Sequence, residues 1–255
     1  MRLETKLENL YALVENISMS LQPPPASSCK ELYDNGVRVN KAYMLQTDTG
    51  KIPVYCHMTN QSIGACGGGG WTLVMKTDGH KSTFHYNSPV WTNKNDFNRP
   101  GGHTGFDFQE TKLPTYWNTP FSKICLGMKI GTQIKFMAVN RHANSLYSLI
   151  ADGRYRATSL GRNTWKTLIG SQASLQRKCN KEGFNAAGVA RDSARARIGF
   201  LGNNENNCVT PDSRIGFGTG GYRDDSNTCG NEAIDHSSSD NGGKHIKAMG
   251  YILVQ

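Results

Sequence analysis

The first 22 residues carry a hydrophobic pattern that repeats every seven positions. Apolar residues fall seven apart in two series, which are Leu3, Leu10 and Ile17, and Leu7, Val14 and Leu21. The two series alternate by four and three residues, which is the a and d spacing of a coiled coil. Because an isolated helix of three heptads is only marginally stable, we expect this helix to form a homo-oligomer. Tyr11 and Leu13 widen the apolar face, which favours a trimer; the alternative is a helix packed on its own domain.

The pattern changes at a proline triplet after this helix. Residues 23–25 are all proline. Proline cannot continue a helix, and consecutive prolines favour a stiff, extended conformation. The sequence therefore divides into a coiled-coil helix at residues 1–22, a proline-rich linker at 23–28 and one globular domain at 29–255.

From residue 29 onward the pattern is that of short strands separated by frequent turns. Apolar or alternating runs predict strands at residues 41–46, 52–56, 71–75, 124–130, 133–139 and 247–254. The Asp-Thr-Gly sequence at 48–50 predicts a hairpin turn between the first two runs. A short helix is expected to begin at 165–169 and to continue towards Leu175. No apolar run reaches the roughly 18 residues of a spanning helix, so no membrane span is expected.

One long segment, residues 202–236, breaks this pattern. It holds only three large aliphatic residues, Val209, Ile215 and Ile234, so we do not expect it to form a regular helix or strand. Twelve of its side chains are Asn, Asp or Glu. Since Ca²⁺ takes six to eight oxygen ligands from such groups, the segment predicts a calcium site. The alternative is that these side chains only cap turns through their own backbone.

The chain as a whole is strongly basic. Lys and Arg outnumber Asp and Glu by 29 to 20, which gives a formal net charge of +9 at pH 7. A basic domain favours acidic partners, although positive charge can also serve solubility alone. Basic residues gather between 177 and 197, as either a solvated face or an anion-binding patch. Aromatic residues are not interleaved with them, so nucleic acid is not an expected partner.

The seven cysteines are widely spaced and include no Cys-x-x-Cys pair. A structural zinc site is therefore not expected. Wide spacing among Gly- and Asn-rich segments is typical of secreted proteins with disulfides, so we expect an extracellular location. The odd number leaves one thiol free or paired between chains.

Sequence motifs of common enzyme classes are absent. The chain contains no His-Glu-x-x-His and no Gly-x-Ser-x-Gly. The glycine-rich run at 216–221 resembles a dinucleotide-binding loop only superficially, because no helix-forming sequence follows it. We therefore expect no enzymatic activity.

Several motifs resemble known protein families. Cys29, the Cys-His-Met at 56–58 and the Gly-Gly-Gly-Gly-Trp-Thr-Leu-Val at 67–74 resemble the opening of a fibrinogen-related domain. Residues 214–221 and 227–233 are similar to the intelectins (X-type lectins) and to fibrinogen-like proteins of the coral skeletal organic matrix. The resemblance implies an α+β, fibrinogen C-terminal-like fold, with a twisted, mainly antiparallel sheet, short helices and long loops.

The resemblance also implies a site. Intelectins bind the exocyclic diol of a sugar directly to Ca²⁺. Carried over motif by motif, the implied calcium ligands are Asn203, Glu205, Asp225, Asn231 and Asp78. The residues implied to lie against the sugar are Asn206, Tyr222 and Asp224, of which Asn206 stands where intelectins have a histidine.

The expected function is that of a secreted, calcium-dependent lectin made multivalent by its coiled coil. Its expected partners are glycans, microbial or acidic, in a role such as innate immunity. The alternative is an extracellular matrix protein of this fold that binds no sugar. In either case we expect disulfides Cys29–Cys56, Cys125–Cys179 and Cys208–Cys229, which leaves Cys66 unpaired.

Overall fold

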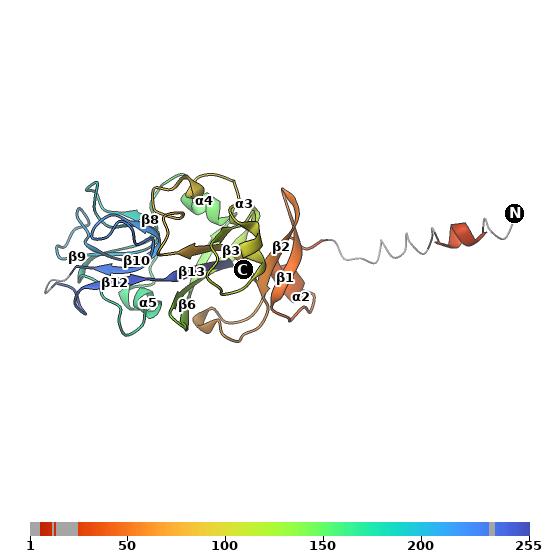
Figure 1. Cartoon of the computed structure of the whole chain (residues 1–255), viewed down its shortest axis with the longest axis horizontal. Coiled ribbons are helices and arrows are strands. Elements are labelled where there is room, and N and C mark those ends of the chain that lie inside the picture. Colours follow the sequence, from red (N-terminus) through yellow and green to blue (C-terminus); the bar gives the residue numbers. More distant parts are fainter. Residues whose placement is uncertain (1–5, 12, 14–24, 235–237) are drawn as a thin grey trace.

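The computed structural model describes residues 6–11, 13, 25–234 and 238–255. From residue 25 onward these residues form two antiparallel sheets with a few short helices (Figure 1). The α+β class expected from the sequence is confirmed at this level. In the described part of the chain, no helix is long and apolar enough to cross a membrane.

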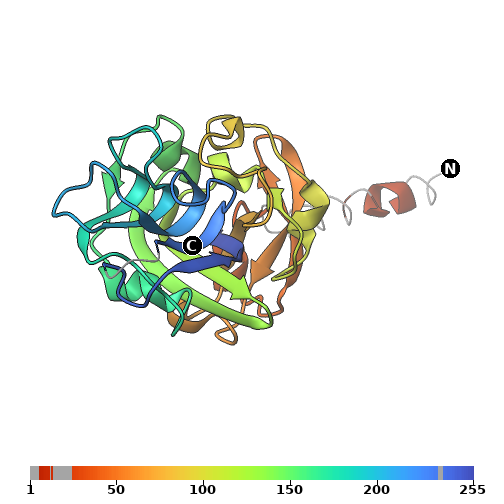
Figure 2. The same cartoon turned by 60° about the vertical axis from the view of Figure 1, so that its left-hand side comes forward.

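The first sheet contains most of the strands predicted from apolar runs. Its strands are β1 (Lys41–Thr47), β2 (Gly50–His57), β3 (Trp71–Asp78), β4 (Thr111–Lys112), β5 (Phe121–Ile130), β6 (Gln133–Ala143) and β13 (Met249–Val254). Their order is β1-β2-β3-β13-β5-β6, with β4 paired to β3. The C-terminal strand β13, dark blue in Figures 1 and 2, lies in the middle of the body, and all of its residues are buried.

The predicted strands of this sheet are confirmed to within a few residues. The exception is the strand predicted at 247–254. It divides at Ala248, since one strand ends at Lys247 and β13 begins at Met249.

The second sheet is formed largely by a part of the chain for which strands were not predicted. Its strands are β7 (Arg156–Ala157), β8 (Lys178–Ala187), β9 (Arg195–Asn203), β10 (Ser213–Gly220), β11 (Cys229–Ala233) and β12 (Lys244–Lys247). Their order is β12-β11-β10-β9-β8-β7, and every pairing is antiparallel.

The expectation that residues 202–236 form no regular strand is wrong, because β10 and β11 lie within them and are fully buried. Glycines make this possible by allowing the strands to pack closely. Gly216 of β10 pairs with Gly199 of β9. A Cβ on Gly216 would meet the carbonyl oxygen of Ile198 at 2.5 Å, so only glycine fits there. Close backbone packing thus replaces the large aliphatic side chains that the segment lacks.

Short helices and one shared core join the two sheets. The helices are α2 (Cys29–Asp34), α3 (Thr115–Asn118), α4 (Leu146–Ile150) and α5 (Arg162–Thr167), with 3-10 turns η1 (Gly64–Cys66), η2 (Pro89–Trp91) and η3 (Arg99–His103). The helix predicted to begin at 165–169 overlaps α5, which starts earlier, at Arg162, and ends at Thr167 without continuing towards Leu175. Val74 and Ile252 of the first sheet belong to the same buried cluster as Phe184 and Phe217 of the second. The sheets therefore pack as one unit.

The structure contains three disulfides, Cys29–Cys56, Cys66–Cys125 and Cys179–Cys208. The first confirms its prediction. The predicted pairs Cys125–Cys179 and Cys208–Cys229 are wrong, and the free cysteine is Cys229, not Cys66.

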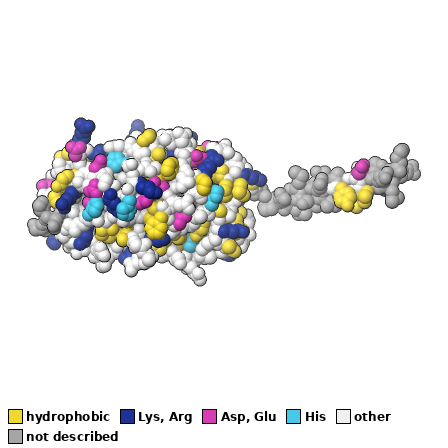
Figure 3. Space-filling view, in the orientation of Figure 1, with side chains coloured by type: hydrophobic (Ala, Val, Ile, Leu, Met, Phe, Trp, Pro, Cys, Tyr) yellow, Lys and Arg dark blue, Asp and Glu magenta, His cyan; other side chains and the backbone are white. Residues whose placement is uncertain are grey.

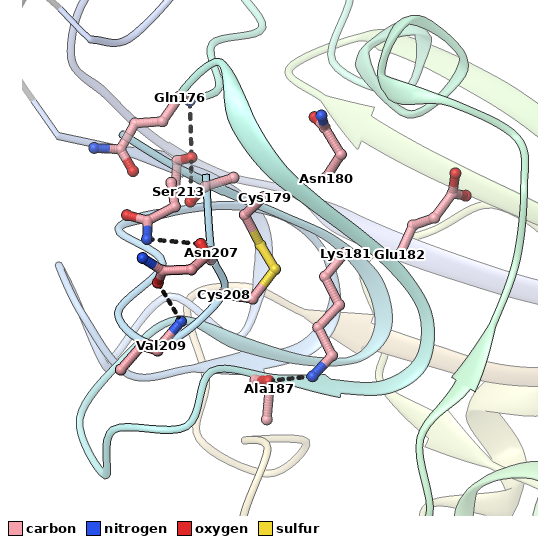
Figure 4. Close-up of a disulfide and its surroundings, with 12 residues drawn as sticks. Gln176, Cys179, Asn180, Lys181, Glu182, Ala187, Asn207, Cys208, Val209 and Ser213 are labelled. Carbon is pink, nitrogen blue, oxygen red and sulfur yellow. Dashed lines mark hydrogen bonds between the residues drawn. A yellow bond between two sulfur atoms is a disulfide. The ribbon is translucent and has the colours of Figure 1, made fainter. Parts of the chain in front are cut away.

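The reason for the different pairing lies in the second sheet. Lys178 of β8 pairs with Asn203 of β9, which places Cys179 beside the loop that follows β9 and contains Cys208 (Figure 4). Cys229 instead lies on β11 with its thiol in the interior, where a Cβ added to Gly250 would meet its Sγ at 2.7 Å. Its burial raises the pKa of the Cys229 thiol to about 12.

Of the N-terminal helix, residues 6–11 and 13 are described, and they are helical. The predicted heptad positions Leu3, Val14, Ile17 and Leu21 lie outside the described residues. Leu7, Leu10, Tyr11 and Leu13 are between 56% and 67% exposed. Within the described residues, the apolar face of this helix is thus left open to solvent.

Candidate functional site

Strand β10 divides the oxygen-rich segment into two loops. The loop at 204–212 enters β10 at Ser213, and the loop at 221–228 leaves it at Gly220. The later loop folds back along the strand, because Arg214, the second residue of β10, donates hydrogen bonds to carbonyls of that loop.

The loop at 204–212 has the hydrogen bonds of a turn. Asn203 is buried; its Nδ2 donates to the carbonyl of Asn207 at 3.0 Å and its Oδ1 accepts from the Asn204 N–H at 2.9 Å. Glu205 is exposed and accepts from Asn204 Nδ2 at 2.6 Å. Asn206 is exposed on the same loop. Asn203 therefore serves the turn-capping role given above as the alternative to calcium binding, and the Cys179–Cys208 disulfide fastens the loop to β8 (Figure 4).

Two other predicted ligands are already engaged. Asn231, on β11, is buried; its Nδ2 donates to the Ser174 carbonyl at 2.8 Å and its Oδ1 accepts from the Ser174 N–H at 2.9 Å. Asp78, at the end of β3, lies 3.0 Å from His80 Nδ1 and 3.7 Å from Lys81 Nζ. Among the described residues, Asp78 belongs to no group of three His, Cys, Asp or Glu side chains that could hold a metal ion.

Beside Arg214, near the start of β10, three side chains converge. One ligand atom each from Asp224, Glu232 and His245 lies within 4.8 Å of the other two. His245 Nδ1 is 2.6 Å from Glu232 Oε1 and 3.3 Å from Asp224 Oδ2. Glu232 of β11 and His245 of β12 are cross-strand partners, and Asp224 comes from the β10–β11 loop. We call these three residues the acidic cluster.

The acidic cluster combines a buried carboxylate with two accessible groups. Glu232 is 1% exposed, whereas the side chain of His245 is 56% exposed. Burial raises the pKa of Glu232, opposed by the hydrogen bond that it accepts from Asn227 Nδ2 at 2.7 Å and by the charges of Arg214 and His245. Burial also raises the pKa of Asp224, but hydrogen bonds from Ser226 and the Lys247 charge outweigh it, so the net pKa is lowered. The two carboxylates therefore differ in how readily they lose a proton.

Arg214 organises the loop that carries Asp224. Its guanidinium is fully buried and donates to the carbonyls of Gly221, Tyr222, Asp224 and Asn227 at 2.5 to 3.2 Å. Burial lowers its pKa to about 10, opposed by the charges of Glu232, Asp224 and Asp225. It remains protonated at neutral pH and turns four carbonyls of the loop inward.

Asp225 is not part of the acidic cluster. Its Oδ1 accepts from the Gly221 N–H at 2.5 Å and lies 2.9 Å from His85 Nε2. Burial would raise the pKa of Asp225, but these two hydrogen bonds outweigh it and lower the pKa. Asp225 therefore links the loop to the segment before η2.

The loop at 221–228 borders three hollows. One of about 470 Å³ opens over the acidic cluster, one of about 400 Å³ lies beside Tyr222 and Arg223, and one of about 750 Å³ lies beside His85 and Ser226. On the face shown in Figure 3, acidic, basic and His side chains lie interspersed over the half of the body that carries the second sheet. This polar, hollowed surface suits a polar ligand.

Sequence reasoning placed Asp224 and Tyr222 in this region but missed Glu232 and His245. Glu232 directly follows Asn231 in the motif at 227–233, so the motif contained a signal for it. His245 joins the site only through the register of β12 against β11. No spacing in the sequence indicates that pairing.

The chain was also compared with known proteins. No model of a known protein family and no curated protein matches it.

Proposed function

We propose that this chain is a secreted, calcium-dependent glycan-binding protein whose calcium site is the acidic cluster. The observation that carries the proposal is the convergence of Asp224 and Glu232 from two segments at the base of an open hollow. Carboxylates are preferred ligands of Ca²⁺, and an ion held by two of them keeps positions open for hydroxyl groups. The resemblance of the opening motifs to fibrinogen-related domains and of residues 227–233 to intelectins supports the same function.

The residues around the cluster fit a cation. The Asn227 amide donates to Glu232 and the Ile246 carbonyl, and its buried Oδ1 has no hydrogen-bond partner in the described structure. It is an unused oxygen on a residue that contacts the cluster. His245 Nδ1 forms a hydrogen bond with Glu232 and lies 3.3 Å from Asp224 Oδ2. In this proposal Asp224 is a calcium ligand, and Tyr222, 43% exposed on the same loop, lies against the sugar.

A glycan array probed with Ca²⁺ and again with EDTA tests this function. We expect glycan binding in Ca²⁺ that is lost in EDTA and reduced by about 100-fold in Asp224→Asn. Removal of one ligand charge weakens the binding of the ion and, through it, the binding of the sugar. Glu205→Gln, a matched change in the loop at 204–212, should bind as the wild type does. Glycan binding that is equal in Ca²⁺ and EDTA would contradict the proposal. Calcium binding without any glycan binding would favour the alternative function, an extracellular matrix protein.

The N-terminal helix makes this site multivalent in our proposal. Linking several weak sites raises avidity by about 10²–10⁴-fold when all can engage at once. Sedimentation of the full chain should show a homo-oligomer, a trimer in our expectation, because Leu7, Leu10 and Tyr11 are exposed and gain by mutual burial. A chain that lacks residues 1–25 should sediment as a monomer. A monomer in both cases would contradict the coiled coil.

A further inference from the structure

We propose that the hollow beside Tyr222 is a subsite for an acidic group, a carboxylate or sulfate, of the bound saccharide. This inference rests on the proposed function, because it names the class of glycan that the same loop binds. Three arginines line the hollow, and each comes from a different position: Arg191 precedes β9, Arg195 begins β9, and Arg223 belongs to the β10–β11 loop. We call it the arginine pocket. Its volume of about 400 Å³ is within the range of small-molecule sites.

The donors of the arginine pocket are largely unused. Within the described residues, none of the three arginines forms an ion pair. Arg195 makes one long hydrogen bond, from Nε to the Ser193 carbonyl at 3.3 Å. A guanidinium presents a planar fork of donors that matches a carboxylate or sulfate. Three like charges around one hollow repel each other, and a bound anion relieves that repulsion.

The walls of the pocket are held together before any ligand binds. The Tyr222 N–H donates to the Asp192 carbonyl at 2.6 Å, which joins the loop at 221–228 to the turn before β9. A Cβ on Gly221 would lie 2.1 Å from the Ser193 carbonyl oxygen, so the two segments are in backbone contact. The buried Arg214 fixes the same loop from below. A site built in this way loses little entropy on binding.

Two carboxylates share the pocket and shape its selectivity. Asp225 is committed to the Gly221 N–H and to His85, and Asp192 is exposed at the edge. The lining therefore keeps a net positive charge, three arginines against two aspartates. A carboxylate or sulfate of the saccharide can therefore bind in the arginine pocket, while the two aspartates accept hydrogen bonds from its hydroxyl groups.

The position of the pocket favours a saccharide over a nucleic acid. Arg223 lines both the arginine pocket and the hollow over the acidic cluster, so the two hollows are neighbours. Tyr222 is the aromatic residue among the pocket's lining residues. Single-stranded nucleic acids bind through several stacked aromatics along a groove. A sugar with a diol at the cation and an acid at the arginines fits this arrangement better.

Matched probes test the subsite. The first pair of probes is methyl sialoside, which carries both an exocyclic diol and a carboxylate, and its methyl ester, which lacks only the charge. The second pair is methyl galactoside 6-sulfate and methyl galactoside, which differ in the sulfate. In titrations with Ca²⁺, we expect at least one acidic probe to bind about tenfold more tightly than its uncharged counterpart, as charge-assisted hydrogen bonds require. The variant R191Q/R223Q should lose that preference. The variant R177Q/K178Q, which removes equal charge at exposed positions outside the pocket, should keep it.

The outcomes separate the subsite from the calcium site. No preference for either acidic probe in the wild type, or an unchanged preference in R191Q/R223Q, would overturn the arginine pocket. If the acidic preference persists in EDTA and disappears in R191Q/R223Q, the arginine pocket stands and calcium dependence fails. If calcium-dependent binding is equal for charged and uncharged probes, the proposed function stands and the arginine pocket fails.

Discussion

Replacement of Arg214 by Met should destabilise the protein by about 3–5 kcal/mol, the range for removing one member of a buried charged network. The guanidinium is the shared donor to four carbonyls of the loop at 221–228. Methionine fills similar volume but donates nothing, so these buried acceptors lose their partner. Because the loop carries Asp224, cation and glycan binding should weaken together with stability.

Urea denaturation measures this effect, with two comparison variants. Arg177→Met, at an exposed position, should change the free energy of unfolding by less than about 0.5 kcal/mol. Arg214→Lys keeps the charge but loses the planar fork, so it should recover only a minor part of the loss. An Arg214→Met variant that lies within about 1 kcal/mol of wild type would show that the loop is not held by this residue.

Removal of the Cys66–Cys125 disulfide should lower the free energy of unfolding by about 4 kcal/mol. Its sequence separation of 59 is the longest of the three disulfides, and a cross-link that closes a long loop restricts the unfolded chain most. The bond joins η1 to β5, which lies beside the central strand β13. The free energy of unfolding of Cys66→Ala/Cys125→Ala, measured by urea denaturation, checks this value.

Cys229→Ala is the matched control for the disulfide variant. Cys229 is buried but unpaired, so its replacement removes only one sulfur from the core, at a cost of about 1 kcal/mol. If Cys229→Ala were as damaging as the double variant, or if peptide mapping found Cys208 bonded to Cys229, the disulfide pattern described above would be contradicted.

The first sheet was predictable from sequence because its strands are marked locally. Residues 71–75 form one apolar run, and residues 124–130 and 133–139 flank a Gly-Thr turn. Strands β10 and β11 carry no such mark. They are buried through glycine contacts such as Gly199 against Gly216, which depend on which strand lies next to which. Hydrophobic periodicity contains no signal for this kind of packing.

The site was only partly predictable for a related reason. The density of Asn, Asp and Glu indicated a segment that contains Asp224 and Glu232 of the acidic cluster, and Tyr222 lies on the same loop as Asp224. The same count could not separate turn-forming residues such as Asn203 from residues that face a hollow. Glu232 and His245 come together only through strand pairing. The disulfides show the same limit, since the register of β8 against β9 places Cys179 near Cys208.

Calcium titration calorimetry on three variants tests the central claim most directly. Asp224→Asn and Glu232→Gln should each weaken Ca²⁺ binding by about 100-fold relative to the wild type, because each removes a carboxylate ligand. As the pH is lowered, Ca²⁺ affinity should begin to fall at a higher pH than it would for a site of exposed carboxylates. The reason is that the raised pKa of Glu232 lets a proton compete with the ion. Glu205→Gln should bind Ca²⁺ as the wild type does. Loss of Ca²⁺ binding in Glu205→Gln, with no change in Asp224→Asn and Glu232→Gln, would contradict the account and place the ion in the loop at 204–212.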